Sequence, residues 1–89
     1  MSHSLGFQQL TVSTSALGLT VPAGASRALI RVSGANGVTF RDDGTDPTAA
    51  IGFPIVSTDP FLLYDGELTK IKFIRTGASD GLLNVSYYN

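Results

Sequence analysis

The sequence contains no cysteine, no tryptophan and only one histidine, His3. The absence of cysteine excludes a disulfide framework, a thiolate metal site and a cysteine nucleophile. A hydrolase triad needs a histidine fixed beside its nucleophile, and a zinc site needs several histidine or cysteine ligands. Because His3 precedes the first plausible strand, we expect it to be a solvated residue of the chain terminus. The composition therefore predicts a protein that is not an enzyme, with no catalytic residue, cofactor or metal site.

Charge is also scarce. Charged residues make up 15% of the 89, and six Lys and Arg nearly balance seven Asp and Glu, which leaves a net charge of -1. Such a chain has no long-range field to attract a polyanion or an anionic membrane, so we expect neither nucleic acid nor membrane as a partner. No apolar run approaches the roughly 20 residues that span a bilayer, and residues 1–4 do not resemble a signal peptide. We expect the protein to remain in the cytosol until it joins other protein chains.

Apolar residues recur with a period of two along most of the chain, and turn residues interrupt them at intervals of about ten residues. In residues 27–33, for example, Ala28, Ile30 and Val32 fall on one face of a predicted strand. The pattern predicts an all-β protein: an antiparallel two-sheet β-sandwich, jelly-roll-like, of seven or eight short strands, with a small barrel as the alternative. A single domain over residues 7–89 would follow a flexible N-terminal arm, residues 1–6.

Three dipeptides that end in glycine have the turn chemistry that joins neighbouring antiparallel strands. Asn36-Gly37 separates residues 27–33 from 38–41, Asp65-Gly66 separates 61–64 from 69–75, and Asp80-Gly81 precedes 82–88. These signals predict two hairpins and a third turn, at Asp80-Gly81, that leads into residues 82–88. The apolar residues expected to face the core in the last two strands are Ile71, Phe73, Leu83, Val85 and Tyr87.

The remaining segments are less regular. Residues 7–13 and 17–21 are rich in Thr, Val and Leu, which favours two further strands near the N-terminus. Residues 42–54 are polar and broken by glycine and proline. They are predicted to form a surface loop, with a short edge strand around residues 50–56.

Four apolar side chains fall on strand faces that the alternation assigns to the outside. They are Leu29, Ile74, Leu82 and Tyr88. If adjacent strands of one sheet carry them, they form a contiguous patch that a soluble monomer does not expose, and self-association would cover it. The alternative is that some face assignments are inverted, because a sandwich has two inner faces. We predict these residues to mediate self-association in a homo-oligomer.

The predicted loop carries the only carboxylate cluster of the sequence, Asp42, Asp43 and Asp46, which follows Arg41. Tight turns account for these residues, because an Asp side chain accepts backbone N–H bonds in such turns. A cation such as Ca²⁺ is the alternative ligand. The spacing does not favour it, since an EF-hand loop needs a glutamate at its twelfth position and a helix on either side.

Two other groups of side chains, one basic and one of tyrosines with aspartates, could bind a partner. Lys70, Lys72 and Arg75 are the densest basic group, and with Arg27 and Arg31 they would make a basic sheet face. Such a face is interpreted as a solvated surface whose lysines discourage edge-to-edge association, with an acidic protein partner as the alternative. A small carbohydrate-binding module, using Tyr64 or Tyr88 with the loop aspartates, is the rival interpretation of the whole chain.

Several blocks of the sequence resemble a known group of proteins. Residues 41–49 read Arg-Asp-Asp-Gly-Thr-Asp-Pro-Thr-Ala, residues 52–54 read Gly-Phe-Pro, and residues 83–88 read Leu-Asn-Val-Ser-Tyr-Tyr. With residues 63–74, these blocks resemble small virion-associated proteins of tailed bacteriophages, in the same order. The likeness covers about residues 27–89 and departs from the pattern at Phe40, where tryptophan is frequent.

The resemblance implies a particle protein, chiefly a head decoration or cement protein and alternatively a tail or fibre component. Such a protein would be a dimer or trimer, would bind the major capsid protein or another virion protein, and would be located in the virion after assembly in the host cytoplasm. The capsid contact is expected in the loop at Arg41, Asp42, Asp43 and Asp46. The arm over residues 1–6 would become ordered on the capsid or on a neighbouring subunit, by strand addition at an exposed edge.

Overall fold

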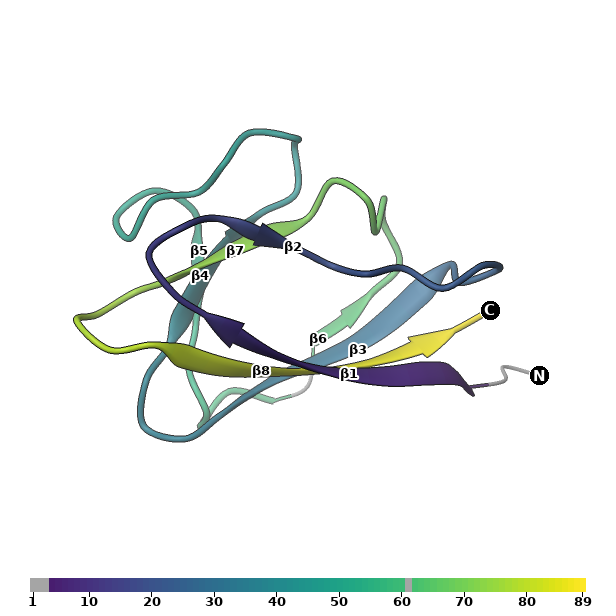
Figure 1. Ribbon diagram of the computed structural model, residues 1–89, viewed down its shortest axis with the longest axis horizontal. Helices are drawn as coiled ribbons and strands as arrows, with labels where there is room; N and C mark the ends of the chain where they lie inside the picture. The colour runs from purple at the N-terminus through teal and green to yellow at the C-terminus, as the bar shows by residue number, and fades with distance from the viewer. Residues whose placement is uncertain (1–3, 61) are drawn as a thin grey trace.

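The structure, a computed structural model, describes residues 4–60 and 62–89, and its elements in that part of the chain are all strands (Figure 1). They are β1 (Ser4–Val12), β2 (Leu17–Gly18), β3 (Arg27–Ser33), β4 (Val38–Arg41), β5 (Phe53–Ile55), β6 (Leu62–Tyr64), β7 (Lys72–Arg75) and β8 (Gly81–Tyr88). The described residues accordingly include no helix that could cross a membrane.

The strands form two four-stranded sheets in which every pair of neighbours is antiparallel. Sheet A has the order β1-β8-β3-β6, and sheet B has the order β2-β7-β4-β5. Apart from β4 and β5, consecutive strands lie in different sheets, which is the arrangement of a jelly roll. The predicted β-sandwich is confirmed, and the two sheets do not close into the alternative barrel.

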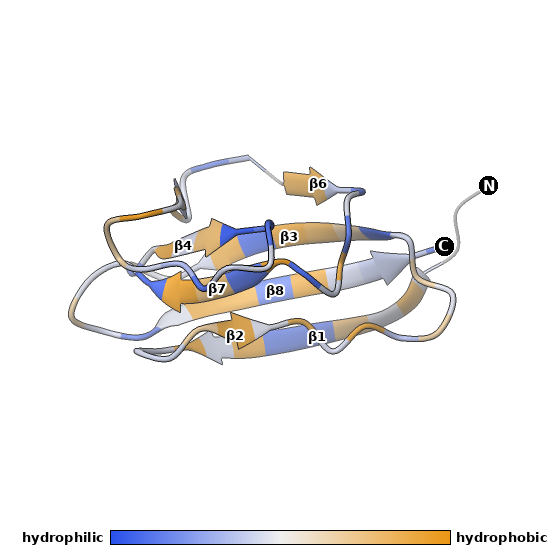
Figure 2. Cartoon of the chain, turned by 90° about the horizontal axis from the view of Figure 1, so that it is seen from above, coloured by the Kyte–Doolittle hydropathy of each residue, from blue (hydrophilic) through white to orange (hydrophobic). Residues whose placement is uncertain are grey.

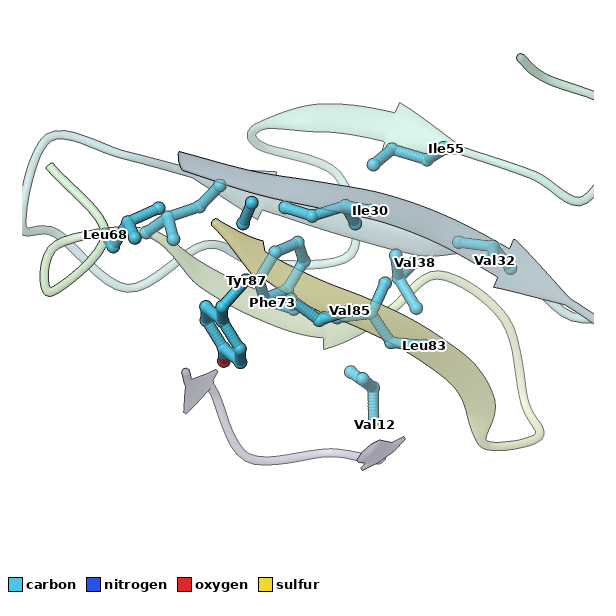
Figure 3. Close-up of a cluster of buried hydrophobic side chains, with 12 residues drawn as sticks. Val12, Ile30, Val32, Val38, Ile55, Leu68, Phe73, Leu83, Val85 and Tyr87 are labelled. Atoms are coloured by element: carbon cyan, nitrogen blue, oxygen red, sulfur yellow. The ribbon is translucent and has the colours of Figure 1, made fainter. Parts of the chain in front are cut away.

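The core fills the space between the two sheets (Figure 3). Ala28, Ile30 and Val32 of β3 are buried, as the alternation of residues 27–33 predicts. The five residues that were expected to face the core in the last two strands are also at most 2% exposed. Period two therefore identified the inner face correctly in β3, β7 and β8, because successive side chains must point to opposite sides of a sheet.

The prediction of two hairpins is wrong, and the third turn also joins strands of different sheets. Asn36-Gly37, Asp65-Gly66 and Asp80-Gly81 join β3 to β4, β6 to β7 and β7 to β8, and each connection crosses from one sheet to the other. No described residue other than glycine has a positive φ, so Asn36 does not adopt the type I′ conformation of a two-residue hairpin. A turn dipeptide indicates a reversal of the chain, and a crossing between facing sheets reverses the chain as a hairpin does.

Two predicted strands are shorter in the structure. The strand predicted from residue 69 begins only at Lys72, because the Lys70 N–H bonds the Glu67 carbonyl at 3.0 Å in a turn. Of residues 17–21, only Leu17–Gly18 pair, with β7. The edge strand expected around residues 50–56 is present as β5.

Half of the expected N-terminal arm is a strand in the structure. Ser4, Leu5 and Gly6 belong to β1, so they are part of the sandwich. The rest of the arm, residues 1–3 with His3, lies outside the described residues, as does Phe61 of the predicted strand 61–64. Figure 2 places β1 with β2 along one edge of the sandwich and β6 along the opposite edge, in agreement with the strand orders.

Candidate interaction surface

The outer face of sheet A carries a row of apolar side chains that crosses the whole sheet. Phe7 of β1 and Leu29 of β3 both pair with Ser86 of β8, and Leu63 of β6 pairs with Leu29. Directly paired residues point to the same face, so the three apolar side chains lie side by side with only Ser86 between two of them. Phe7 is 67% exposed and Leu63 is 58% exposed.

Tyr88 extends this row toward the end of the sheet, where it pairs with Arg27. We call Phe7, Leu29, Leu63 and Tyr88 the apolar patch. A depression of about 210 Å³ lies between its members and is lined by Arg27, Leu29, Leu63 and Tyr88. A smaller one, about 100 Å³, is lined by Phe7, Leu29, Arg31, Asn84 and Ser86. Pockets for small-molecule ligands usually exceed about 300 Å³, so these hollows suit single protein side chains better.

The other half of the same face is polar. The Gln9 Nε2 donates to Asn84 Oδ1 at 2.9 Å, and Asn84 Nδ2 donates to Ser33 Oγ at 3.0 Å. This hydrogen-bonded row, with Arg31 paired opposite Asn84, separates the apolar patch from Leu82. The outer face of sheet A is thus divided into an apolar end and a polar end.

The four residues predicted for self-association do not form one patch. Leu29 and Tyr88 belong to the apolar patch, Leu82 lies beyond the polar row, and Ile74 lies on β7 in sheet B. The condition for a contiguous patch, that all four share one sheet, is therefore not met, because Ile74 belongs to sheet B. Hairpin pairing would have placed β7 beside β8, but the connection between them crosses the sandwich.

Sequence reasoning missed Phe7 and Leu63. Alternation along β1 could have identified Phe7. Leu10 and Val12 point inward, so the odd-numbered residues of this strand, including Phe7, point outward. In the three-residue strand β6, both neighbours of Leu63 are less exposed than Leu63 itself. A run of three apolar or aromatic residues carries no alternation, so its faces are assigned only by pairing with β3.

Positive charge borders the apolar patch. Arg27 and Arg31 are the charged residues among the outward-facing strand positions of sheet A that the structure describes, and no Asp or Glu occupies such a position. An Arg27 guanidinium nitrogen donates to the Asn89 carbonyl oxygen at 3.1 Å. A partner surface with apolar side chains and carboxylates around them would complement this face.

The loop predicted as the capsid contact holds its charged residues in separate interactions. Arg41 Nε donates to Asp43 Oδ1 at 3.2 Å, the Tyr64 hydroxyl donates to Asp42 Oδ2 at 3.0 Å, and Lys72 Nζ lies 3.0 Å from Asp46 Oδ1. The three carboxylates therefore face different partners. Within residues 4–60 and 62–89, no three His, Asp or Glu side chains are grouped closely enough to hold a metal ion.

These contacts shift the pKa values of three side chains, Arg41 and Asp43 at the loop and Tyr64 of β6. The hydrogen bond from Arg41, aided by the Thr45 N–H, lowers the pKa of Asp43 and raises that of Arg41. Burial, with the hydrogen bond to Asp42, raises the pKa of Tyr64 to about 12. Tyr64 belongs to sheet A and Asp42 follows β4 of sheet B, so this hydrogen bond ties the two sheets together at one edge.

The same loop covers the outer face of sheet B. Thr39, which points outward from β4, is only 1% exposed, because its hydroxyl donates to the Ala49 carbonyl at 3.5 Å and lies 3.0 Å from the Thr76 hydroxyl. Gly52 lies so close to β4 that a Cβ there would come within 2.6 Å of the Phe40 carbonyl oxygen. Residues 42–52 are therefore a packed cover.

The predicted basic face does not exist as one surface. Lys70, Lys72 and Arg75 pair with Glu67, Asp46 and Asp80 at 3.6, 3.0 and 3.0 Å. Arg27 and Arg31 lie in the other sheet. This arrangement is one of paired surface charges, which favour solubility and contribute little to stability.

The aromatic and acidic residues of the carbohydrate-binding interpretation are also separated. Tyr88 lines the depression on sheet A, whereas Asp42 and Asp43 line another, of about 370 Å³, beside Phe53. Tyr64 uses its hydroxyl on Asp42. In comparisons with known proteins, no family model, curated protein or solved structure matches this chain.

Proposed function

We propose that this protein is a non-enzymatic structural protein of a tailed-phage particle, a head decoration or cement protein that binds the capsid through the apolar patch. The observation that carries the proposal is the patch itself, with Phe7 and Leu63 largely exposed on a rigid four-stranded sheet. The resemblance over residues 27–89 supports the phage particle as its location. The jelly-roll architecture is compatible with this role, since it recurs in viral capsid and lectin domains, although a fold alone does not define a function.

The patch has the composition of a binding site for another protein. Large apolar side chains contribute most of the free energy of association when a partner removes them from water, at about 25 cal/mol per Å² of apolar area. Because Phe7, Leu29 and Tyr88 stand on paired strands, their backbone needs no ordering when the partner binds. The partner that fits is the surface of the major capsid protein, if it offers apolar side chains bordered by carboxylates for Arg27 and Arg31.

The same features explain how such a protein would stabilise a head. A rigid sandwich that bridges neighbouring capsid subunits adds the free energy of each contact to the shell. If the protein is an oligomer, each particle-bound copy also raises the effective concentration of its neighbours, which can strengthen binding by about 10² to 10⁴. No chemical step is required, and the working residues are those that become buried.

The test is co-sedimentation of the purified protein with phage heads that lack it. Leu63→Asp places a charge in the apolar patch, and Ile51→Asp is the matched control, because Ile51 is also 58% exposed but lies in the loop over sheet B. We expect Leu63→Asp to weaken binding by roughly 30-fold or more, the effect of losing an interface anchor, and Ile51→Asp to bind like the wild type.

The opposite pattern would contradict the patch as the contact. If Ile51→Asp releases the protein from heads while Leu63→Asp does not, the contact is the loop at Arg41 to Asp46. If the wild type ignores heads but binds tails, or binds a glycan on an array, the decoration proposal is wrong and the fibre or carbohydrate-binding function replaces it.

A further inference from the structure

β1 is the one long edge strand of the described sandwich. It has nine residues, whereas the other three edges are β2 with two residues, β5 with three and β6 with three. β5 also contains Pro54, which has no backbone N–H to offer another strand. The chain thus limits pairing at three of its edges and leaves the fourth available.

From Phe7 to Val12, the free edge of β1 lacks the charge, proline and bulge that normally prevent pairing with another chain, and the segment after β2 reaches the strand through the Thr20 N–H, which donates to the Gln8 side chain at 3.3 Å. Ser4–Val12 contain no charged residue and no proline. In the part of the chain that the structure describes, the backbone of β1 bonds only to β8, on one side of the strand. The irregularity between Ser4 and Gly6 is confined to the start of the strand, so residues 7–12 pair in regular register. An exposed, regular and uncharged edge is a template for strand addition.

We infer that two copies of this chain associate through β1, whose free edges pair antiparallel across a two-fold axis to make one continuous eight-stranded sheet. This inference deepens the oligomerisation in the proposed function by naming its contact. A two-fold axis pairs the same surface of both copies, and an antiparallel strand can meet an identical strand in this way. Directly opposed residues then lie on the same face, so outward residues such as Phe7 and Gln9 stay outward in both copies.

Charge distinguishes this contact from a face-to-face dimer. Packing two apolar patches against each other would bring the guanidinium groups of Arg27 and Arg31 from both copies into one interface, where like charges repel. Pairing through β1 opposes no charged residues, because the arginines lie on β3, with β8 between that strand and β1. It also leaves both patches uncovered on one side of the extended sheet, where they can bind a common partner.

The experiment is light scattering of the wild type and of Gln9→Lys/Thr11→Lys over a range of concentrations, without phage heads. Both substituted residues are exposed and face outward beside the free edge, so the dimer would oppose like charges across its axis. We expect twice the mass of 9.3 kDa for the wild type and at least a 10-fold higher dissociation constant for the variant. The control is Thr45→Lys/Ser79→Lys, which adds the same charge at exposed loop residues and should dimerise like the wild type.

Hydrogen exchange identifies the contact independently of substitutions. In the wild type, those backbone amides of residues 7–12 that point to the free edge should exchange more slowly at high concentration, while those of β8, already paired on both sides, should not change. A protein that is monomeric at all concentrations would overturn the inference. So would a dimer that Leu63→Asp dissociates and the lysine pair leaves intact. A monomer would leave the proposed capsid contact of the patch unaffected, whereas a dimer held together by Leu63 would cover the patch and contradict that contact as well.

Discussion

The two sheets of the sandwich differ in what covers their outer faces. On sheet B, residues 42–52 fold back over β4, so that the outward side chain of Thr39 is 1% exposed. On sheet A, no segment of the described chain lies over Phe7, which is 67% exposed. The outer face of sheet B is covered by the protein's own chain, in which Ile51 is 58% exposed, whereas the outer face of sheet A presents apolar side chains of its own strands to the solvent.

The difference follows from the positions of the hydrogen bonds and ion pairs that can hold a covering segment on a sheet. The covering loop satisfies much of its own hydrogen bonding, as in the paired backbone bonds between Thr48 and Ile51, and it is attached to sheet B by the ion pair between Asp46 and Lys72. At the apolar end of sheet A, the adjoining outward side chains Phe7, Leu29 and Leu63 have no polar group that could hold such a loop. Its apolar patch is therefore available to another chain, and we take this contrast to separate structural residues from binding residues.

The largest effect on stability is expected when the same substitution, Phe→Ala, is made once between the two sheets and once on the outer face of sheet A. Phe73→Ala removes a side chain with no exposed surface from between the sheets and should cost about 3–5 kcal/mol of unfolding free energy. Phe7→Ala, in the apolar patch, should change it by less than about 1 kcal/mol. Urea denaturation measures both. Equal losses would mean that the outer face of sheet A is part of the core, and the contrast would fail.

A second pair of substitutions tests the cover on sheet B. Gly52 has a φ of 140° and no room for a Cβ beside the Phe40 carbonyl, so Gly52→Ala should destabilise the protein by about 2 kcal/mol or more. Gly77→Ala is the matched control, because a Cβ at Gly77 would meet nothing within 4 Å. We expect the control to shift the unfolding free energy by less than about 0.5 kcal/mol. A harmless Gly52→Ala would show that the loop is not packed as described.

The smallest effect concerns the link between the sheets at Tyr64. Tyr64→Phe removes the hydrogen bond to Asp42 and should cost about 1 kcal/mol at neutral pH. Since folding raises the pKa of Tyr64 from about 10 to about 12, its contribution is complete below pH 10 and is lost as the pH rises toward 12. Between pH 9 and pH 12, the free energy of unfolding should therefore fall more steeply with pH for the wild type than for Tyr64→Phe. Parallel curves would contradict the assignment.

The parts of this fold that could be predicted are those governed by local geometry. Residues 27–33 and 82–88 became strands with the predicted inner faces, because a buried strand must alternate its side chains. The jelly-roll-like sandwich followed from many short strands separated by turn residues. The candidate site was predicted only in part: Leu29 and Tyr88 are in the apolar patch, but Phe7 and Leu63 were missed.

By itself, the sequence determined that this chain is an all-β domain with Ile30, Phe73 and Val85 in its core and without the histidines or cysteines of a metal centre. Only the tertiary structure decided which strands are neighbours, and hence that Leu29 and Leu63 share a face while Ile74 lies on the other sheet. The physical reason is that alternation and turn chemistry act over a few residues, whereas pairing between strands distant in the chain depends on the packing of the whole sandwich.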